Sequence, residues 1–348
     1  MDYKSSHPLQ RYWDLALCSV KADALRTALE LDLFTALTQP ASAAAVAQRL
    51  DLDPANTGHL LELLWSMELV TRVRTSRGAA TPWMYRSADV ARRYLVKDAP
   101  EYCAGAWAFR LSSLRRFGQH LGDHLHREPT GTGDAPATAN ASAWAAAAQA
   151  QIGQEQYAVT ARAAVSVLER AGELRDAQRF LDLGGGPGLV AIELARANPA
   201  LHGVIYDLPE PVTVARDNIE HARLTARLSV RGGDLIADGI GDGYDFVWCS
   251  SVLHFVPDIR GMLEKIRRAL RTGGVLVSAH AEIPESAVAA ARVLPYYLPL
   301  LMRGCHVTRE GELASAMQEA GFAHVRGFEV SSFPMTPIQV LIAKAGPE

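Results

Sequence analysis

The sequence predicts an α/β protein in which an all-helical, winged-helix-like N-terminal domain precedes a doubly wound, Rossmann-like domain. Three observations lead to this fold class. The 348 residues exceed what one hydrophobic core normally organises, so two domains are expected. Apolar residues repeat at helical spacing in the first part of the chain. From Arg179 onward, short apolar strands alternate with helices, which is the pattern of a parallel sheet covered on both faces.

The composition is that of an ordinary globular protein, with 49% hydrophobic and 21% charged residues. The 35 basic and 38 acidic residues give a net charge of −3, without the basic excess typical of nucleic-acid binding. The chain begins without a signal-peptide pattern, and no apolar run approaches the ~20 residues of a membrane span. The four cysteines lie far apart and form no CxxC pair. These features predict a cytoplasmic protein with no nucleic-acid or membrane partner.

Residues 1–126 carry the helix and turn signals of the predicted N-terminal domain. Apolar positions repeat at helical spacing over residues 9–37. Ser42 stands at the N-cap of an alanine-rich helix that ends near Leu50, and Asp53-Pro54 begins the next helix. A hairpin is expected to follow, with its parts at residues 69–73 (strand), 76–78 (turn) and 84–85 (strand).

This winged-helix pattern has two interpretations, a DNA-reading module or a packing surface. A DNA reader needs lysine and arginine along its recognition helix. The segment 54–69 contains neither and is rich in leucine. The sequence therefore favours dimerisation, and a regulator that senses a ligand through its second domain remains the weaker alternative.

The expected boundaries follow from composition. Helices with many aromatic residues are predicted over residues 90–126. Residues 127–142 are rich in Pro, Gly, Thr and Ala, and a helix over residues 143–170 follows them. We therefore expect a linker and connecting helix at 127–170 and the second domain at 171–348.

The second domain is predicted from its alternating elements. The expected helices cover residues 189–198, 212–222, 259–270 and 313–320. The expected strands are FLDLG, HGVIYDL, ARLSVRGGD, DFVWCS, GGVLVSAH, VRGFEV and QVLIAKA.

The first strand leads into the glycine loop LDLGGGPG, residues 181–188. Glycine allows the backbone to turn sharply and to approach a ligand closely. The dinucleotide fingerprint has the spacing G-x-G-x-x-G. Gly184 and Gly186 fit that spacing, but the third glycine is Gly188, and Asp182 lies at the strand end.

Acidic residues also end the next two strands. Asp207 is placed to accept the hydroxyls of a ribose, and Asp234 to accept the exocyclic amine of an adenine. Three acids in successive units predict one nucleoside cofactor crevice at the carboxyl ends of the strands. The candidate cofactor-binding residues are Asp182, Gly184, Gly185, Gly186, Gly188, Asp207, Leu208, Gly233, Asp234, Leu235 and Ser250.

Four segments, LDLGGGPG, YDLPEPV, GGDL and SSVLHFVPD, carry a family resemblance in both order and spacing. From Arg179 to the C-terminus the chain resembles a class I S-adenosylmethionine-dependent methyltransferase. The whole chain resembles the small-molecule O-methyltransferases of the caffeate, hydroxyneurosporene and acetylserotonin type. The resemblance implies S-adenosylmethionine as cofactor and a small aromatic or heteroaromatic acceptor, with oxygen as the expected acceptor atom. It also implies a homodimer that interlocks through the N-terminal domains.

The resemblance places His254, in VLHF, at the general-base position of the family. An imidazole suits this role because its pKa lies near the operating pH. The family usually continues with Asp-Trp-x-Asp, whereas residues 255–258 are Phe-Val-Pro-Asp. Family carboxylates that lie beside the base correspond here to His280 and to His306 or Val307, with Glu282 and Glu312 nearby.

This departure leaves two interpretations of the catalytic candidates His254, His280 and His306. Either His254 is a weaker base that acts on an already acidic acceptor, or the three imidazoles converge on a divalent metal. Their spacing is no local metal motif, so no metal is predicted. Methylation of carbon or nitrogen is the alternative reaction, as is a step without methyl transfer, namely hydroxylation, decarboxylation or a pericyclic reaction.

The acceptor pocket is expected along residues 292–303. A pocket lined by apolar and aromatic side chains favours a flat organic ring. For each of these residues taken singly, ordinary helix packing explains the residue type as well as a place in the acceptor pocket does. The candidate substrate residues are Trp107, Tyr296, Tyr297, Leu300 and Met302.

Overall fold

The computed structural model describes residues 7–74, 82–126, 151–333 and 338–346. The chain divides into two compact units, Met1–Arg116 and Phe117–Glu348, which are described separately. The turn predicted at residues 76–78 and the linker at 127–142 lie outside the described residues.

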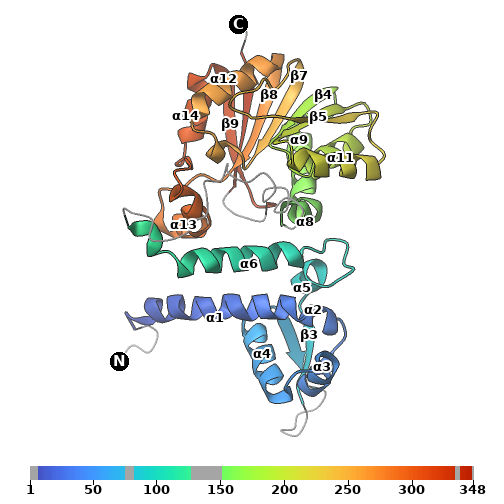
Figure 1. Ribbon diagram of the computed structural model, residues 1–348, viewed down its shortest axis with the longest axis vertical. Helices are drawn as coiled ribbons and strands as arrows, with labels where there is room; N and C mark the ends of the chain where they lie inside the picture. Colours follow the sequence, from blue (N-terminus) through green and yellow to red (C-terminus); the bar gives the residue numbers. More distant parts are fainter. Residues whose placement is uncertain (1–6, 75–81, 127–150, 334–337, 347–348) are drawn as a thin grey trace. The chain divides into compact units, whose positions relative to one another are not determined.

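The first unit combines helices with a small antiparallel sheet (Figure 1). The sheet has the strand order β1-β3-β2. β1 was not predicted, because a two-residue strand has no periodicity to detect. The elements are α1 (Gln10–Glu30), α2 (Leu33–Ala36), β1 (Ala41–Ser42), α3 (Ala43–Leu50), α4 (Pro54–Ser66), β2 (Val70–Val73), β3 (Met84–Ser87), α5 (Asp89–Tyr94) and α6 (Ala104–Gln119).

Both predicted helix caps are present. The Ser42 hydroxyl accepts a hydrogen bond from the Ala45 N–H at 3.2 Å, and Asp53 Oδ1 accepts one from the Asn56 N–H at 2.7 Å. Such caps satisfy amide groups that have no partner within the helix. The helical pattern over residues 9–37 is interrupted after α1, where Asp32 adopts a left-handed conformation with φ of 54° and starts the separate helix α2.

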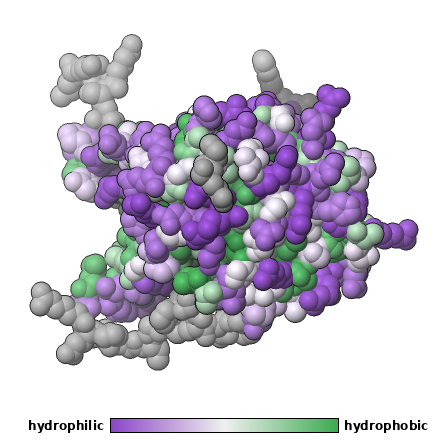
Figure 2. Space-filling model, turned by 90° about the horizontal axis from the view of Figure 1, so that it is seen from above, coloured by the Kyte–Doolittle hydropathy of each residue, from purple (hydrophilic) through white to green (hydrophobic). Residues whose placement is uncertain are grey.

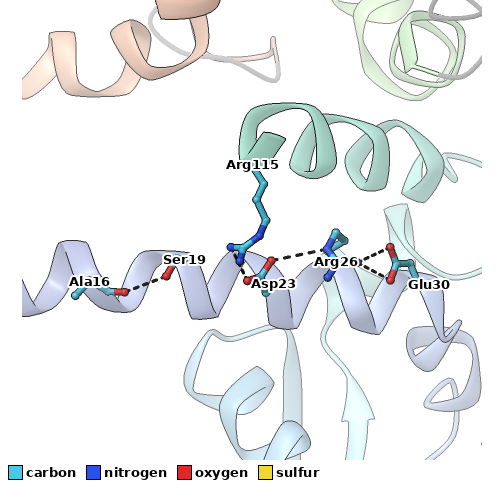
Figure 3. A network of polar contacts seen from close by, with 6 residues as sticks. All are labelled: Ala16, Ser19, Asp23, Arg26, Glu30 and Arg115. Atoms are coloured by element: carbon cyan, nitrogen blue, oxygen red, sulfur yellow. Dashed lines mark hydrogen bonds and ion pairs between the residues drawn. The ribbon is translucent and has the colours of Figure 1, made fainter. Parts of the chain in front are cut away.

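Polar contacts fix the C-terminal half of α1 (Figure 3). Arg26 pairs with Glu30 at 2.7 Å and lies 3.8 Å from Asp23. The second oxygen of Asp23 pairs with Arg115 of α6 at 2.6 Å. This ion pair joins two helices that lie side by side in the first unit (Figure 1).

The second unit is a seven-stranded sheet covered by helices on both faces (Figure 1). The strand order is β6-β5-β4-β7-β8-β10-β9. Its elements are η1 (Asp123–Leu125), α8 (Gly153–Glu155), η3 (Gln156–Thr160), α9 (Ala161–Ala171), β4 (Arg179–Leu183), α10 (Leu189–Ala197), β5 (His202–Asp207), α11 (Pro211–His221), β6 (Leu228–Gly232), β7 (Tyr244–Ser250), η4 (Leu253–Phe255), α12 (Ile259–Ala269), β8 (Leu270–His280), α13 (Ala287–Leu301), α14 (Glu312–Glu319), β9 (Phe322–Val330) and β10 (Ile338–Ala345).

One edge of this sheet corrects the prediction of a purely parallel arrangement. β10 runs antiparallel to both β8 and β9, whereas the pairs among β4 to β8 are parallel. β9 ends at Val330 and β10 begins at Ile338. A parallel pair needs a crossover of a dozen or more residues, so this short connection requires a hairpin.

Alternate residues of the central strands enter two cores. In β7, Phe246 and Trp248 pack with α9, α10, α11 and α13, and Val247 and Cys249 pack with α12 and α14. Burial on both faces explains why these strands are continuous apolar runs.

The view in Figure 2 shows a face on which hydrophilic residues predominate and smaller hydrophobic areas lie between them. In the described part of the chain, none of the helices combines the length and apolar character needed to cross a membrane.

Candidate functional site

The candidate site lies at the carboxyl ends of the parallel strands in the second unit. Along the chain, β4, β5 and β6 extend the sheet in one direction, and β7 and β8 extend it in the other. The order therefore reverses between β4 and β7. In doubly wound folds, ligands bind at such a reversal, because the loops after the two strands separate there.

The glycine loop between β4 and α10 has a backbone that side chains would obstruct. Gly184, Gly186 and Gly188 have φ of 71°, 54° and 75°, values that favour glycine. A Cβ on Gly185 would lie 2.7 Å from Asp182 Oδ2. At Gly186, by contrast, the nearest atom to a Cβ would be 3.8 Å away, on Ile152. The loop thus combines a left-handed backbone with an ordinary van der Waals contact beside Gly186, to Ile152, among the described residues.

Two polar side chains hold this loop, and the sequence analysis missed both. Gln156 accepts a hydrogen bond from the Leu189 N–H at 3.2 Å and donates one to the Gly185 carbonyl at 3.4 Å. Asn218 donates to the Pro187 carbonyl at 2.8 Å. Neither residue belongs to a local motif, since the hydrogen-bonded partners lie 29 to 33 residues apart in the sequence. Only the folded chain brings them together.

Asp207, at the end of β5, is hydrogen-bonded to the same loop. Its Oδ2 accepts a hydrogen bond from the Gly186 N–H, and its Oδ1 accepts one from the Leu208 N–H, both at 2.7 Å. Burial raises the pKa of Asp207, and these two backbone hydrogen bonds oppose the rise. The carboxylate therefore holds a fixed orientation, and each oxygen keeps a further lone pair for a ligand.

The turn after β6 contains three further candidates. The Gly233 N–H donates to the Asp207 carbonyl at 3.0 Å, which joins this turn to the end of β5. Asp234 is exposed, and its Oδ1 accepts a hydrogen bond from the Ile236 N–H at 2.8 Å. Leu235 is half-buried. The structure thus places Asp207 and the Gly233–Leu235 turn at neighbouring strand ends.

Asp182 lies beneath the glycine loop and is 2% exposed. Among the described residues, no donor reaches its buried Oδ2. Burial, and secondarily the charge of Asp207, raises the pKa of Asp182 to about 7. An unpaired buried carboxylate is costly unless a cation or donor compensates it, so this oxygen marks a place where a cationic ligand would be favoured.

Replacing Asp182 should change how stability depends on pH. The pKa of Asp182 is about 7 in the folded protein, above its ordinary value of 3.8. As the pH rises, the Asp182 carboxyl group therefore loses its proton in the unfolded chain before it does so in the folded protein. The unliganded protein should therefore lose stability as pH rises from about 4 to about 7. Asp182→Asn should raise the thermal midpoint relative to the parent at pH 8, and the gain should shrink towards pH 4. A pH-independent difference in midpoint would contradict this pKa.

His254 follows β7 on the short helix η4 and is 9% exposed. Its ring lies 4.2 Å from that of Phe255 and 5.5 Å from that of Tyr297, measured between centroids. Burial lowers the pKa of His254 to about 4. The imidazole is therefore neutral at neutral pH and has a lone pair available for a proton.

His280, at the end of β8, is buried and has partners on both ring nitrogens. Its Nε2 accepts hydrogen bonds from the N–H groups of Val252 and Leu253, both at 3.1 Å. Its Nδ1 lies 2.8 Å from the Ser278 hydroxyl. Burial, together with nearby His254, lowers the pKa of His280 to about 3. His280 is thus a neutral acceptor that holds the backbone just before His254.

The same segment contacts the glycine loop. Ser251 adopts a left-handed conformation with φ of 54°, and Ser250 ends β7 in a half-buried position. A Cβ on Gly184 would lie 2.6 Å from the Val252 side chain. The backbone that His280 holds therefore packs directly on the cofactor candidate Gly184.

His306 has a different environment. Its side chain is 51% exposed, and its Nε2 lies 2.7 Å from Glu312 Oε1. Glu282 is buried and accepts hydrogen bonds from the Gly311 and Leu313 N–H groups, next to the start of α14. Within the residues that the structure describes, no cluster of three or more His, Cys, Asp or Glu is arranged to hold a metal ion. The interpretation of three converging imidazoles is therefore not supported.

Helix α13 supplies four of the predicted substrate residues. Tyr297 is buried against His254, and the Tyr296 ring lies 5.1 Å from that of Tyr297. Leu300 is partly buried in the core, and Met302 caps the helix in a half-buried position. Trp107 lies on α6 in the first unit, with the Arg110 guanidinium 5.4 Å from its ring centroid. The second unit therefore brings His254 and Tyr297 into contact by itself.

Two family models match the chain. The model of the O-methyltransferase domain matches residues 122–323, and that of the O-methyltransferase dimerisation domain matches residues 13–97.

Individual proteins of known activity are also similar. The chain is 29% identical over 272 residues to 3-hydroxy-5-methyl-1-naphthoate 3-O-methyltransferase of Streptomyces sahachiroi, covering 76% of this chain and 75% of that protein. It is 28% identical to the N,N-dimethyltransferase OxyT of Streptomyces rimosus, covering 87% of each. Among solved structures, human N-acetylserotonin methyltransferase with bound SAM has a TM-score of 0.77 at 21% identity and covers 100% of both chains. This last similarity shows the shared fold.

Proposed function

The chain belongs to the O-methyltransferase family, and from this premise we propose that it methylates a hydroxyl group of a small aromatic or heteroaromatic molecule. It is an S-adenosylmethionine-dependent methyltransferase, as are the members of this family. The observation that carries the proposal is the glycine loop, where the left-handed backbone at Gly184, Gly186 and Gly188 lies next to Asp182, whose buried Oδ2 has no hydrogen-bond partner among the described residues.

We propose that the cofactor lies across the strand ends around this loop. The left-handed backbone at Gly186 and the lone pairs of Asp207 suit a ribose, and the Gly233–Leu235 turn suits an adenine. Asp182 contributes negative charge below the loop, which favours a cation there. When bound, S-adenosylmethionine supplies a methyl group attached to a positively charged sulfur.

In this proposal, His254 accepts the proton of the acceptor hydroxyl. Its neutral imidazole follows β7, next to the segment that contacts Gly184. Tyr297 and Tyr296 supply aromatic surface beside it, with Leu300 and Met302 further along α13. His280 orients the segment before His254 through its two backbone hydrogen bonds.

We further infer that the chain forms a homodimer. Residues 13–97 match the dimerisation model. The N-terminal half of α1 exposes large apolar side chains, namely Tyr12, Trp13, Leu15, Leu17 and Val20. Several large exposed apolar side chains on one helix are typical of an interface. The four cysteines are unpaired, from which we infer a cytoplasmic location.

The proposal is tested by incubating the protein with S-adenosylmethionine labelled in its methyl group and a panel of hydroxylated naphthalenes, phenols and matched amines. Label should enter an ether on an aromatic oxygen. Transfer only to the amines would replace oxygen by nitrogen as the acceptor atom, the atom that the OxyT name gives for that relative. Calorimetry with S-adenosylhomocysteine should show binding whether or not the panel contains a good acceptor.

A further inference from the structure

We propose that the acceptor of this site carries an unusually acidic hydroxyl, such as that of an electron-poor phenol or an enol, because none of the carboxylates that the structure describes pairs with the base. This inference rests on the proposed function and narrows its substrate class. It also assigns His280 a positioning role in place of an acid.

The surroundings of His254 are aromatic and apolar. The rings of Phe255 and Tyr297 lie 4.2 Å and 5.5 Å from its own, and the side chain is almost fully buried. Histidines elsewhere pair with carboxylates, as His120 does with Asp123 and His306 with Glu312. For His254, none of the described carboxylates forms such a pair, and burial is the only influence on its pKa.

His280, at the end of β8, holds the segment that leads to His254. The lone pair of its Nε2 accepts the Val252 and Leu253 N–H groups, and its Nδ1 contacts the Ser278 hydroxyl. This ring is neutral, since burial holds its pKa far below neutrality. His280 therefore fixes the base segment but adds no negative charge that would stabilise a protonated His254.

The acids that lie near His280 and His306 in the sequence are engaged elsewhere. Glu282 binds the Gly311 and Leu313 N–H groups at the start of α14. Glu312 binds His306 through one oxygen and the Arg309 N–H through the other. Neither carboxylate is available to replace the missing partner without losing these contacts.

An imidazole in such surroundings is a weak base. A protonated His254 would be buried, and no carboxylate of the described residues pairs with it, which explains why its pKa falls to about 4. An ordinary phenol has a pKa of ~10, and each unit that separates acid from base lowers the extent of proton transfer about tenfold. A matched acceptor must therefore release its proton much more readily than an ordinary phenol.

The reaction balances without any further reactant. The acceptor oxygen bonds to the methyl carbon, and the electron pair of the broken carbon–sulfur bond stays on sulfur. The hydroxyl proton passes to His254 or to water. The products are a methyl ether, S-adenosylhomocysteine and one proton.

The test uses a series of fluorinated phenols, in which fluorine lowers the pKa of the hydroxyl with little change in size. With the full-length protein at pH 7, kcat/KM should rise about fivefold for each unit by which the phenol pKa falls, until the phenol is ionised in solution. Equal kcat/KM for ordinary and acidic phenols would overturn the proposal. Failure to methylate any phenol, amine or naphthol would instead count against the proposed function, and the inference would fall with it.

Two substitutions of His280 separate the effect of a negative charge beside His254 from the effect of holding the segment in position. In His280→Glu, a carboxylate can accept the same two N–H groups and adds a negative charge beside His254. It should raise kcat/KM about tenfold for the least acidic phenol and change it little for the most acidic one. The neutral His280→Gln is the matched control and should keep the steep dependence on acidity. Calorimetry with S-adenosylhomocysteine identifies folded variants, and equal slopes for folded Glu and Gln variants would contradict the inference.

Discussion

His254→Ala should lose about 10²- to 10³-fold of kcat/KM for the best hydroxylated acceptor while its affinity for S-adenosylhomocysteine stays within about twofold of the parent. The variant removes the proposed proton acceptor after β7. It leaves the glycine loop and Asp207, at the ends of β4 and β5, unchanged. Isotope transfer measures turnover, and calorimetry measures binding.

Two further variants make this experiment specific. His202→Ala removes an exposed histidine at the start of β5, at the opposite end of the strands, and should keep parental turnover. Because His254 packs against Phe255 and Tyr297, the alanine variant also loses buried contacts. His254→Gln fills most of that space without an imidazole and should show the same loss. Near-parental turnover in the Gln variant would remove the base assignment.

Asp207→Asn should weaken binding of S-adenosylhomocysteine about 10²-fold. The carboxylate accepts the Gly186 and Leu208 N–H groups with separate oxygens. The amide nitrogen of asparagine faces one of these donors without being able to accept its hydrogen bond. A hydrogen bond to a charged group contributes about 1.5–3 kcal/mol, which corresponds to roughly ten- to a hundredfold, and the proposed ribose contact adds to this.

The matched control is Asp217→Asn, which makes the same charge change on the exposed side of α11. Its affinity should equal that of the parent. If Asp207→Asn and Asp217→Asn bind S-adenosylhomocysteine equally well, Asp207 does not contact the nucleoside, and the cofactor must lie elsewhere on the strand ends.

Several elements could be predicted because their causes are local. The caps at Ser42 and Asp53 depend on hydrogen bonds that span three residues. The strands of the second unit are short apolar runs between helices, so their positions and the fold class were predicted correctly. The direction of β10 was not predicted, because a strand's own residues are the same in parallel and antiparallel pairs.

Long-range contacts limited what could be said of the site. Gln156 was missed because its contacts with Gly185 and Leu189 join a connecting helix to a loop that follows much later in the chain. The three histidines were considered together because the resemblance aligned them with one catalytic group. The fold separates their environments: His254 is buried and pairs with none of the described carboxylates, His280 binds backbone amides, and His306 pairs with Glu312 near the surface.

The sequence by itself determined the doubly wound domain, the glycine loop and the acids at successive strand ends, because strand alternation and glycine spacing act over a few residues. The tertiary structure alone decided that one oxygen of Asp182 has no partner in the described part of the chain and that His280 accepts two amides from the segment before His254. Protonation and hydrogen bonding in a buried site depend on which groups from distant strands meet there and on how much water they exclude.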